Sequence, residues 1–310
     1  MAITASMVKE LREMTGVGML ECKKALTETD GDMEKAVEYL REKGLAASAK
    51  KAGRIASEGL VDIYVSEDKK SAAIVEVNSE TDFVAKNQTF KDYVANVAKQ
   101  AASSSAANMD EFFEEKWSLD EAFTVKEALS QQVAVIGENL NIRRFEKYVR
   151  EVAGSLVSYV HGGGRIGVLI ELACEKEAAE LEELGKNVAM QIAALNPKFI
   201  AVENVPAEFI EKEKEILTQQ AKNDPKNASK PDNIIEKMIT GRLHKEMKEI
   251  CLVEQPYVKD GDMTVKQYID SVAKVVGAPI TISRYVRFET GEGLAKKEEN
   301  FAEEVAKAAQ

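Results

Sequence analysis

The fold is decided by a mostly apolar stretch, Ala72-Ala73-Ile74-Val75-Glu76-Val77-Asn78, which predicts a β-strand. A second apolar run, Leu60–Val65, precedes it, and the polar residues 66–70 between the two are typical of a turn. Two such runs joined by a short polar segment predict a β-hairpin. A helical pattern follows from about Asn87 to Ala102, so the first unit is a hairpin with a helix after it.

The same pattern returns in the second half of the chain. Leu156–Val160 and Ile166–Leu172 predict another hairpin, and a helix is expected from about Lys176 to Ala194. Val75-Glu76-Val77 in the first unit aligns with Ile170-Glu171-Leu172 in the second. An internal duplication is the economical explanation, and it predicts an α+β protein with two hairpin-plus-helix core subdomains.

Residues 1 to about 45 predict three short helices, each with an apolar face. Thr4 or Ser6 can cap the first helix, and Gly44 is expected to stop the third. Residues 46–54 then predict a linker. The positive charge of residues 41–54 either is solvated, which is the favoured interpretation, or contacts an acidic surface. The apolar faces are Met7, Val8, Leu11 and Met14 in the first helix, Leu20, Cys22, Ala25 and Leu26 in the second, and Met33, Ala36, Val37 and Leu40 in the third.

The remaining segments complete the predicted organisation. Residues 109–137 are expected to be helical, 141–145 to form a strand, and 281–289 to form a strand that completes the second sheet. Helices at about 208–223 and 234–251 flank a segment with two prolines, which interrupt a helix and predict a helical hairpin. This hairpin is either an internal packing element or an exposed arm. The predicted divisions are 1–54 (three-helix module and linker), 55–140 (N-terminal core subdomain), 141–290 (C-terminal core subdomain with the hairpin inserted at about 208–255) and 291–310 (C-terminal module with a short helix at 301–309).

Composition limits the kinds of function. Among 310 residues, 53 acidic side chains outnumber 42 basic ones and give a net charge of −11, which argues against a general nucleic-acid binder. Three cysteines match neither a disulfide framework nor a zinc pattern, and two histidines exclude a multi-histidine metal site. No run predicts a membrane span, and no secretory signal is visible. We therefore expect a cytoplasmic protein without metal or cofactor that acts on protein partners, not directly on nucleic acid or membranes.

A glycine-rich segment, His161-Gly162-Gly163-Gly164-Arg165-Ile166-Gly167, contains a literal Gly-x-Gly-x-x-Gly. A dinucleotide site needs these glycines between a strand and a helix, but here they are expected to join two strands. The segment is also similar to the oxyanion loop of esterases, but no nucleophile elbow accompanies it. A hairpin turn is the favoured interpretation, with His161 as a residue at the end of a strand.

The segment Ser79–Asn87 has two interpretations. Ser79 and Asp82 fit a helix capping box, with Phe83 packed beneath the following helix. Alternatively, an aromatic residue directly after an acid, in a polar loop between a strand and a helix, is a candidate binding site, because loops on rigid sheets commonly carry function. Taken alone, the segment favours the capping interpretation.

Taken together, these segments resemble the bacterial elongation factor Ts family, the exchange factors for elongation factor Tu. The resemblance implies an N-terminal three-helix module similar to a ubiquitin-associated (UBA) domain, a duplicated core, an inserted antiparallel coiled coil and a C-terminal module. It also implies a non-enzymatic exchange factor of translation elongation that promotes GDP release so that GTP can bind. The matching stretches occur in the family's order: Val8–Arg12, Met14–Leu26, Asn78–Asn87, Ile136–Arg144, His161–Val168 and Tyr285–Glu289.

The resemblance further implies which residues contact the partner. Thr81, Asp82, Phe83 and Val84 match a loop that enters the GTPase domain of elongation factor Tu near its magnesium site. There the aromatic ring separates a helix from the phosphate-binding region. The other implied contacts are Arg12, Met19 and Leu20 in the N-terminal module, His161 near the intruding loop, and Phe301 and Val305 in the end helix. The segment Ser103–Asp120 resembles the family less and is assigned no role.

Two other functions stay open from the residues alone. A scaffold or chaperone-like binder would use the three-helix module and the helical arm, and it predicts varied partners without nucleotide dependence. An enzyme would use the glycine-rich turn and His161, and it predicts direct binding of a nucleotide or an ester. A homodimer formed through the core or the coiled-coil arm is equally open.

Overall fold

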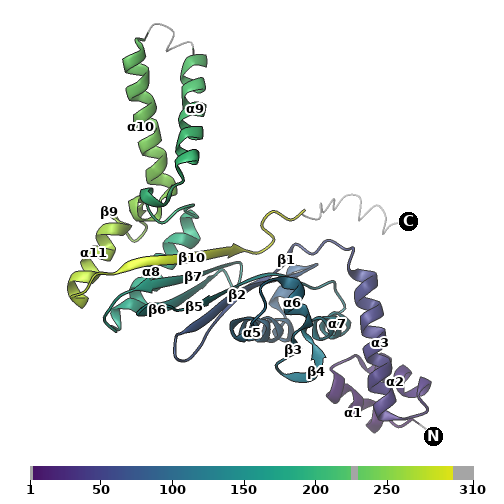
Figure 1. Cartoon of the computed structure of the whole chain (residues 1–310). Helices are drawn as coiled ribbons and strands as arrows, with labels where there is room; N and C mark the ends of the chain where they lie inside the picture. Colours follow the sequence, from purple (N-terminus) through teal and green to yellow (C-terminus); the bar gives the residue numbers. More distant parts are fainter. Residues whose placement is uncertain (1–2, 225–229, 296–310) are drawn as a thin grey trace.

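A computed structural model describes residues 3–224 and 230–295, and it has the predicted α+β architecture. Two three-stranded antiparallel sheets form its centre, ordered β1-β2-β5 and β10-β7-β6. Helices α1–α3 lie at one end of the molecule, and the α9–α10 hairpin projects near the other (Figure 1). The strands of the two sheets are β1 (Glu58–Val65), β2 (Ser71–Ser79), β5 (Asn141–Val149), β6 (Gly154–His161), β7 (Ile166–Ala173) and β10 (Thr281–Glu289).

The central strand β2 is covered on both faces. Val75 and Val77 pack with helix α5 (Gln88–Ser103), whereas Ala72 and Ile74 pack with side chains of the second sheet. Alternate residues of a strand point to opposite faces, so burial on both sides makes the whole run apolar. This continuous apolar pattern explains why the hairpin is recognisable in the sequence, and the prediction is confirmed.

The second sheet is built in the same way around β7. Ile170 and Leu172 pack with helix α8 (Glu180–Leu195), and Leu169 packs between the two sheets. The predicted second hairpin is confirmed, and β10 completes this sheet beside β7 as expected. The helix begins at Glu180, a few residues later than the sequence pattern predicts.

Each central strand carries one buried glutamate at the aligned position. Glu76 is fully buried and pairs with Arg143 and Arg144, at 3.0 and 2.6 Å. Glu171 pairs with Arg284 at 2.6 Å. A buried carboxylate needs such a cation, because burial without one is strongly unfavourable. The matching pairs support the hypothesis of an internal duplication.

Helix α8 comes close to β6 at Gly185, where a Cβ would lie 2.5 Å from the Val157 side chain. We expect Gly185→Ala to lower the free energy of unfolding by about 1–3 kcal/mol, because the added methyl overpacks this contact. Gly44→Ala is the matched control: its Cβ would lie 3.6 Å from that of Ala134, an ordinary contact. Thermal unfolding of both variants tests this, and an unchanged midpoint for Gly185→Ala would contradict it.

The N-terminal part contains the three predicted helices, and Thr4 caps the first through a hydrogen bond from the Met7 amide. The third helix does not stop at Gly44, so that prediction and the linker expected from residue 46 are wrong: residues 46–51 are helical. Gly44 is buried against Ala134, where a small residue lets two helices approach. The helices are α1 (Ala5–Thr15), α2 (Met19–Glu28) and α3 (Met33–Lys51).

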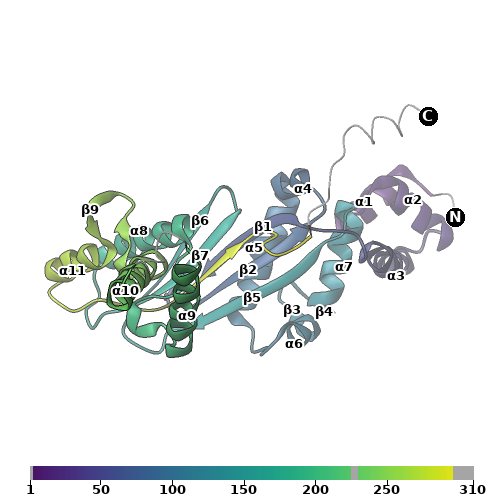
Figure 2. The same ribbon diagram turned by 90° about the horizontal axis from the view of Figure 1, so that it is seen from above.

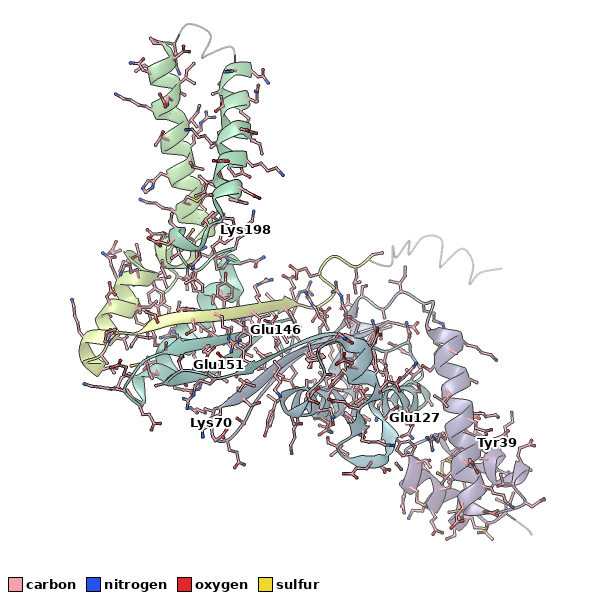
Figure 3. All side chains as sticks on the ribbon, viewed as in Figure 1. Tyr39, Lys70, Glu127, Glu146, Glu151 and Lys198 are labelled. Atoms are coloured by element: carbon pink, nitrogen blue, oxygen red, sulfur yellow. The ribbon has the colours of Figure 1, made fainter. Side chains whose placement is uncertain are left out.

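Helix α3 packs on α7 (Val125–Ile136), which belongs to the first half of the core. Arg41 donates to Glu127 at 2.5 Å, and its guanidinium lies over the Phe123 ring. Glu127 lies between the N-terminal helices and the core in Figure 3. The hydrogen bond from the Thr124 amide, followed by the Arg41 contact, lowers the pKa of Glu127. The three helices are therefore held against the core by a charged contact as well as by packing.

Residues 109–137 are not one helical segment as predicted. A two-stranded hairpin divides them, and the capping box of Thr124 and Glu127 starts a new helix after it. The second half contains the same arrangement, with Thr264 and Gln267 as its capping box. The elements are α6 (Met109–Glu114), β3 (Lys116–Trp117), β4 (Asp120–Thr124) and α7 in the first half, and β8 (Pro256–Tyr257), β9 (Asp260–Thr264) and α11 (Val265–Val276) in the second.

Strand β5 confirms the strand predicted at 141–145 and extends it to Val149. The predicted boundary at residue 140 assigns this strand to the C-terminal subdomain, but its backbone pairs with β2 in the first sheet. A local sequence pattern shows that a strand forms, not which strand it pairs with, because pairing depends on distant residues. The proposed division of the core therefore needs its boundary after β5.

The helical hairpin is an arm rather than an internal packing element. Helices α9 (Ala207–Asn223) and α10 (Asp232–Ile250) run side by side away from the sheets (Figures 1 and 2). Its base contains a buried apolar cluster that includes Val205, Met247 and Cys251. Single turns of 3₁₀-helix at Val202–Asn204 and Leu252–Glu254 flank the pair. Within the described residues, no helix is both long and apolar enough to cross a membrane.

Candidate functional site

The short helix α4 (Asp82–Lys86) lies directly after β2 and carries the central residues of the predicted loop. Thr81 caps this helix, with its hydroxyl accepting a hydrogen bond from the Val84 amide at 3.4 Å. The predicted capping by Ser79 is wrong, because the Ser79 hydroxyl instead donates to the Thr81 carbonyl at 3.0 Å. The cap of the helix thus lies two residues later than predicted, and the helix begins at Asp82.

Phe83 is 79% exposed, so the predicted packing beneath the following helix is wrong. Val84 is buried in the apolar core below the first sheet and supplies the packing instead. Lys86 lies beside the Phe83 ring, with its Nζ 5.8 Å from the ring centroid. One turn of helix therefore holds an aromatic side chain in solvent, where a partner could bury it. Burying a phenylalanine is worth about 1.5–3 kcal/mol.

Asp82 is the second exposed residue of this turn. Its carboxylate accepts a hydrogen bond from Lys86 at 2.6 Å, and this contact lowers the pKa of Asp82. The carboxylate is consequently ionised at neutral pH. Lys86 is not among the predicted site residues, although its spacing of four from Asp82 is a recognisable signal for a pair on one helix face.

The glycine-rich segment forms the turn between β6 and β7, so the predicted hairpin turn is confirmed. Gly164 has a φ of 102°, and a Cβ there would lie 2.6 Å from Cδ2 of Leu60. The Val61 amide also donates to the Gly164 carbonyl at 2.7 Å. The positive φ and the close approach to Leu60 favour glycine at this position, and the backbone hydrogen bond from Val61 fixes the turn on strand β1.

This turn and helix α4 share one groove. Asp82 and Lys86 line one side of it, and Gly162 and Gly163 line another. His161, at the start of the turn, is exposed, and its Nδ1 lies 2.9 Å from the Tyr159 hydroxyl. The structure therefore brings the predicted loop at 81–84 and the turn after His161 to the same end of the two sheets.

The N-terminal candidates lie on the separate helical part of the chain. Arg12, Met19 and Leu20 are all exposed, with Leu20 at 84%. Leu20 and Met14 were expected on the apolar faces of their helices, but both point to solvent, while Cys22 and neighbouring residues fill the core. Phe301 and Val305 lie outside the described residues.

Within the described ranges, 3–224 and 230–295, no three histidine, cysteine, aspartate or glutamate side chains lie close enough together to hold a metal ion. Cys22, Cys174 and Cys251 are buried and free. Burial raises the pKa of the Cys22 and Cys251 thiols, so these two are poor nucleophiles at neutral pH.

The fold and the site define an α+β protein with a helical module and a projecting arm, whose candidate site is an exposed helical turn beside a surface groove. Residues 80–292 match the family model described as Elongation factor TS. The proteins named Elongation factor Ts from Clostridium novyi and Clostridium botulinum strain Eklund 17B are each 57% identical to this chain. The alignments cover 98% of the chain and 97% and 98% of the relatives. The chain belongs to the elongation factor Ts family.

Proposed function

We propose that this chain is a guanine-nucleotide exchange factor for elongation factor Tu and that it acts in translation elongation. The exposure of Phe83, 79% in a turn of helix that the rest of the chain holds in place, is the observation that carries the proposal. Thr81 fixes the start of this turn, and buried Val84 fixes its other face. A side chain presented in this way is suited to insertion into another protein.

In the proposed mechanism, Phe83 enters the GTPase domain of elongation factor Tu near its bound magnesium and separates a helix from the phosphate-binding region. The ionised Asp82 accompanies it and adds a negative charge beside the nucleotide phosphates. Both effects weaken the binding of GDP. By linkage, if the factor lowers the affinity of elongation factor Tu for the nucleotide, then bound nucleotide lowers the affinity of elongation factor Tu for the factor to the same extent.

We propose that Phe83 alone does not account for the full weakening of GDP binding. Burial of one phenylalanine, about 1.5–3 kcal/mol, corresponds to roughly a 10- to 150-fold change in GDP affinity. Further binding energy is proposed to come from Arg12, Met19 and Leu20 in the N-terminal module and from His161 beside the loop. Phe301 and Val305 are proposed to contribute through the C-terminal module. The factor itself is proposed to bind no nucleotide or metal.

The reciprocity gives a direct test by calorimetry. We expect the chain to bind nucleotide-free elongation factor Tu more tightly than the GDP-bound form, by the same factor by which the chain weakens GDP binding. Equal affinity for both forms would contradict the proposal and favour a scaffold that binds without regard to nucleotide. Binding of GDP by the isolated chain would instead favour an enzyme.

A further inference from the structure

The loop that leads into α4 is held by a side chain from a distant part of the sequence, Glu138. One carboxylate oxygen, Oε2, accepts hydrogen bonds from the amides of Glu80 and Thr81 at 3.1 and 3.0 Å. The other oxygen, Oε1, accepts from the Thr81 hydroxyl at 2.7 Å. Glu138 therefore holds the residue that caps α4, and it satisfies two backbone amides that have no partner in the sheet.

A second set of contacts connects this loop to the end of helix α3. Glu80 accepts from the Asn139 amide at 2.6 Å and pairs with Arg54 at 3.3 Å. The Asn139 side chain donates to the Arg54 carbonyl at 2.8 Å. The Lys51 ammonium, in the last turn of α3, donates to the Gly137 carbonyl at 2.7 Å. The end of α3, the end of α7 and the loop before α4 thus meet at one point.

Helix α4 depends on such external support. It has five residues, too few for a stable helix by itself, because the first turn of a helix costs more conformational entropy than its hydrogen bonds return. Phe83, the side chain with the greatest apolar surface in α4, packs against little of the protein. The direction of α4 is therefore set by Thr81 at its start and by Val84 beneath it.

We propose that Glu138 is a positioning residue that holds α4 in the orientation from which Phe83 and Asp82 engage the partner. Glu80, whose amide Glu138 holds, pairs through its side chain with Asn139 and Arg54, so the loop is also fixed relative to the end of α3 and the two partner-contacting parts are held at a constant spacing. This inference rests on the proposed exchange function. Glu138 itself need not touch the partner.

The test compares Glu138→Ala with Glu138→Gln. Alanine removes all three hydrogen bonds. Glutamine has the same length as glutamate. Its carbonyl oxygen can accept from the two amides, and its NH₂ group can donate to the Thr81 hydroxyl. We expect Glu138→Ala to lower the maximal rate of GDP release from elongation factor Tu about tenfold or more, because hydrogen bonds to a charged acceptor are lost. Glu138→Gln should retain most of the rate.

Glu115 provides a matched control. Its carboxylate accepts from the Ser104 hydroxyl at 2.8 Å and from the Ser105 amide at 3.0 Å, at the opposite end of helix α5 from the site. Glu115→Ala therefore removes a comparable loop contact far from α4. We expect it to affect thermal stability much as Glu138→Ala does, but to leave the exchange rate unchanged.

Amide hydrogen exchange in the free chain separates positioning from general destabilisation. The Glu80 and Thr81 amides should exchange at least about tenfold faster in Glu138→Ala, while the amides of α5 keep their protection. The inference would be overturned if these two amides kept their wild-type protection in Glu138→Ala. It would also be overturned if Glu115→Ala slowed GDP release as much as Glu138→Ala does. If the wild-type chain does not accelerate GDP release, the proposed function fails, and amide exchange still decides whether Glu138 holds the loop.

Discussion

Replacement of Phe83 by alanine is expected to lower the maximal rate of GDP release from elongation factor Tu by roughly 10- to 150-fold. The loss corresponds to the burial energy of one phenylalanine, about 1.5–3 kcal/mol. Affinity for nucleotide-free elongation factor Tu should fall much less, because the N-terminal contacts are still present. Stopped-flow release of fluorescent GDP, measured over a range of factor concentrations, separates the two effects.

The Phe83→Ala variant should fold normally, because the side chain is 79% exposed and contributes little to the core. Leu119→Ala is a suitable control, since Leu119 is 62% exposed in the turn between β3 and β4 and lies outside the proposed contacts. An unchanged maximal rate in Phe83→Ala would contradict the insertion of this ring. An equal loss in Leu119→Ala would show that the effect is not specific to α4.

Replacement of Leu20 by aspartate is expected to have the opposite kinetic signature. Leu20 is 84% exposed near the start of α2, where a negative charge is favourable for the helix, so the fold should be retained. A charge in the proposed apolar contact should weaken affinity for elongation factor Tu at least about tenfold, as expected for a central interface residue. The maximal rate at saturating factor should be unchanged.

Titration of GDP release against factor concentration tests this prediction, and deletion of residues 1–54 should weaken binding further. Leu119→Asp is the matched control for an added surface charge. An unchanged half-saturating concentration in Leu20→Asp would remove the N-terminal helices from the proposed interface. A lowered maximal rate would instead indicate that these helices act on the nucleotide site through α4.

Much of the fold could be predicted from the sequence because its signals are local. Strands β2 and β7 are covered on both faces and therefore appear as continuous apolar runs. The errors arose where distant residues decide the outcome. Gly44 lies inside a helix and packs against Ala134, which is 90 positions away in the sequence. Strand β5 pairs with β2, which is also distant in the sequence.

In the candidate site, too, the local features could be predicted and those set by distant residues could not. The segment around Phe83 was identified as a candidate from its residues and from the family resemblance, and its exposure supports the binding interpretation over internal packing. The orientation of α4 could not be predicted, because Glu138 is distant in the sequence from Thr81, and its carboxylate reaches the loop through the tertiary packing of the chain. No local pattern distinguishes this glutamate from a solvent-exposed one.

The most direct test of the proposed function uses elongation factor Tu loaded with fluorescent GDP and mixed with excess unlabelled GDP. The chain is added at a small fraction of the elongation factor Tu concentration. The proposed mechanism predicts that each factor molecule releases GDP from many partner molecules, so the signal decays completely and faster than in the absence of the factor. Release that is not accelerated, or that stops after one GDP per factor molecule, would contradict catalytic nucleotide exchange.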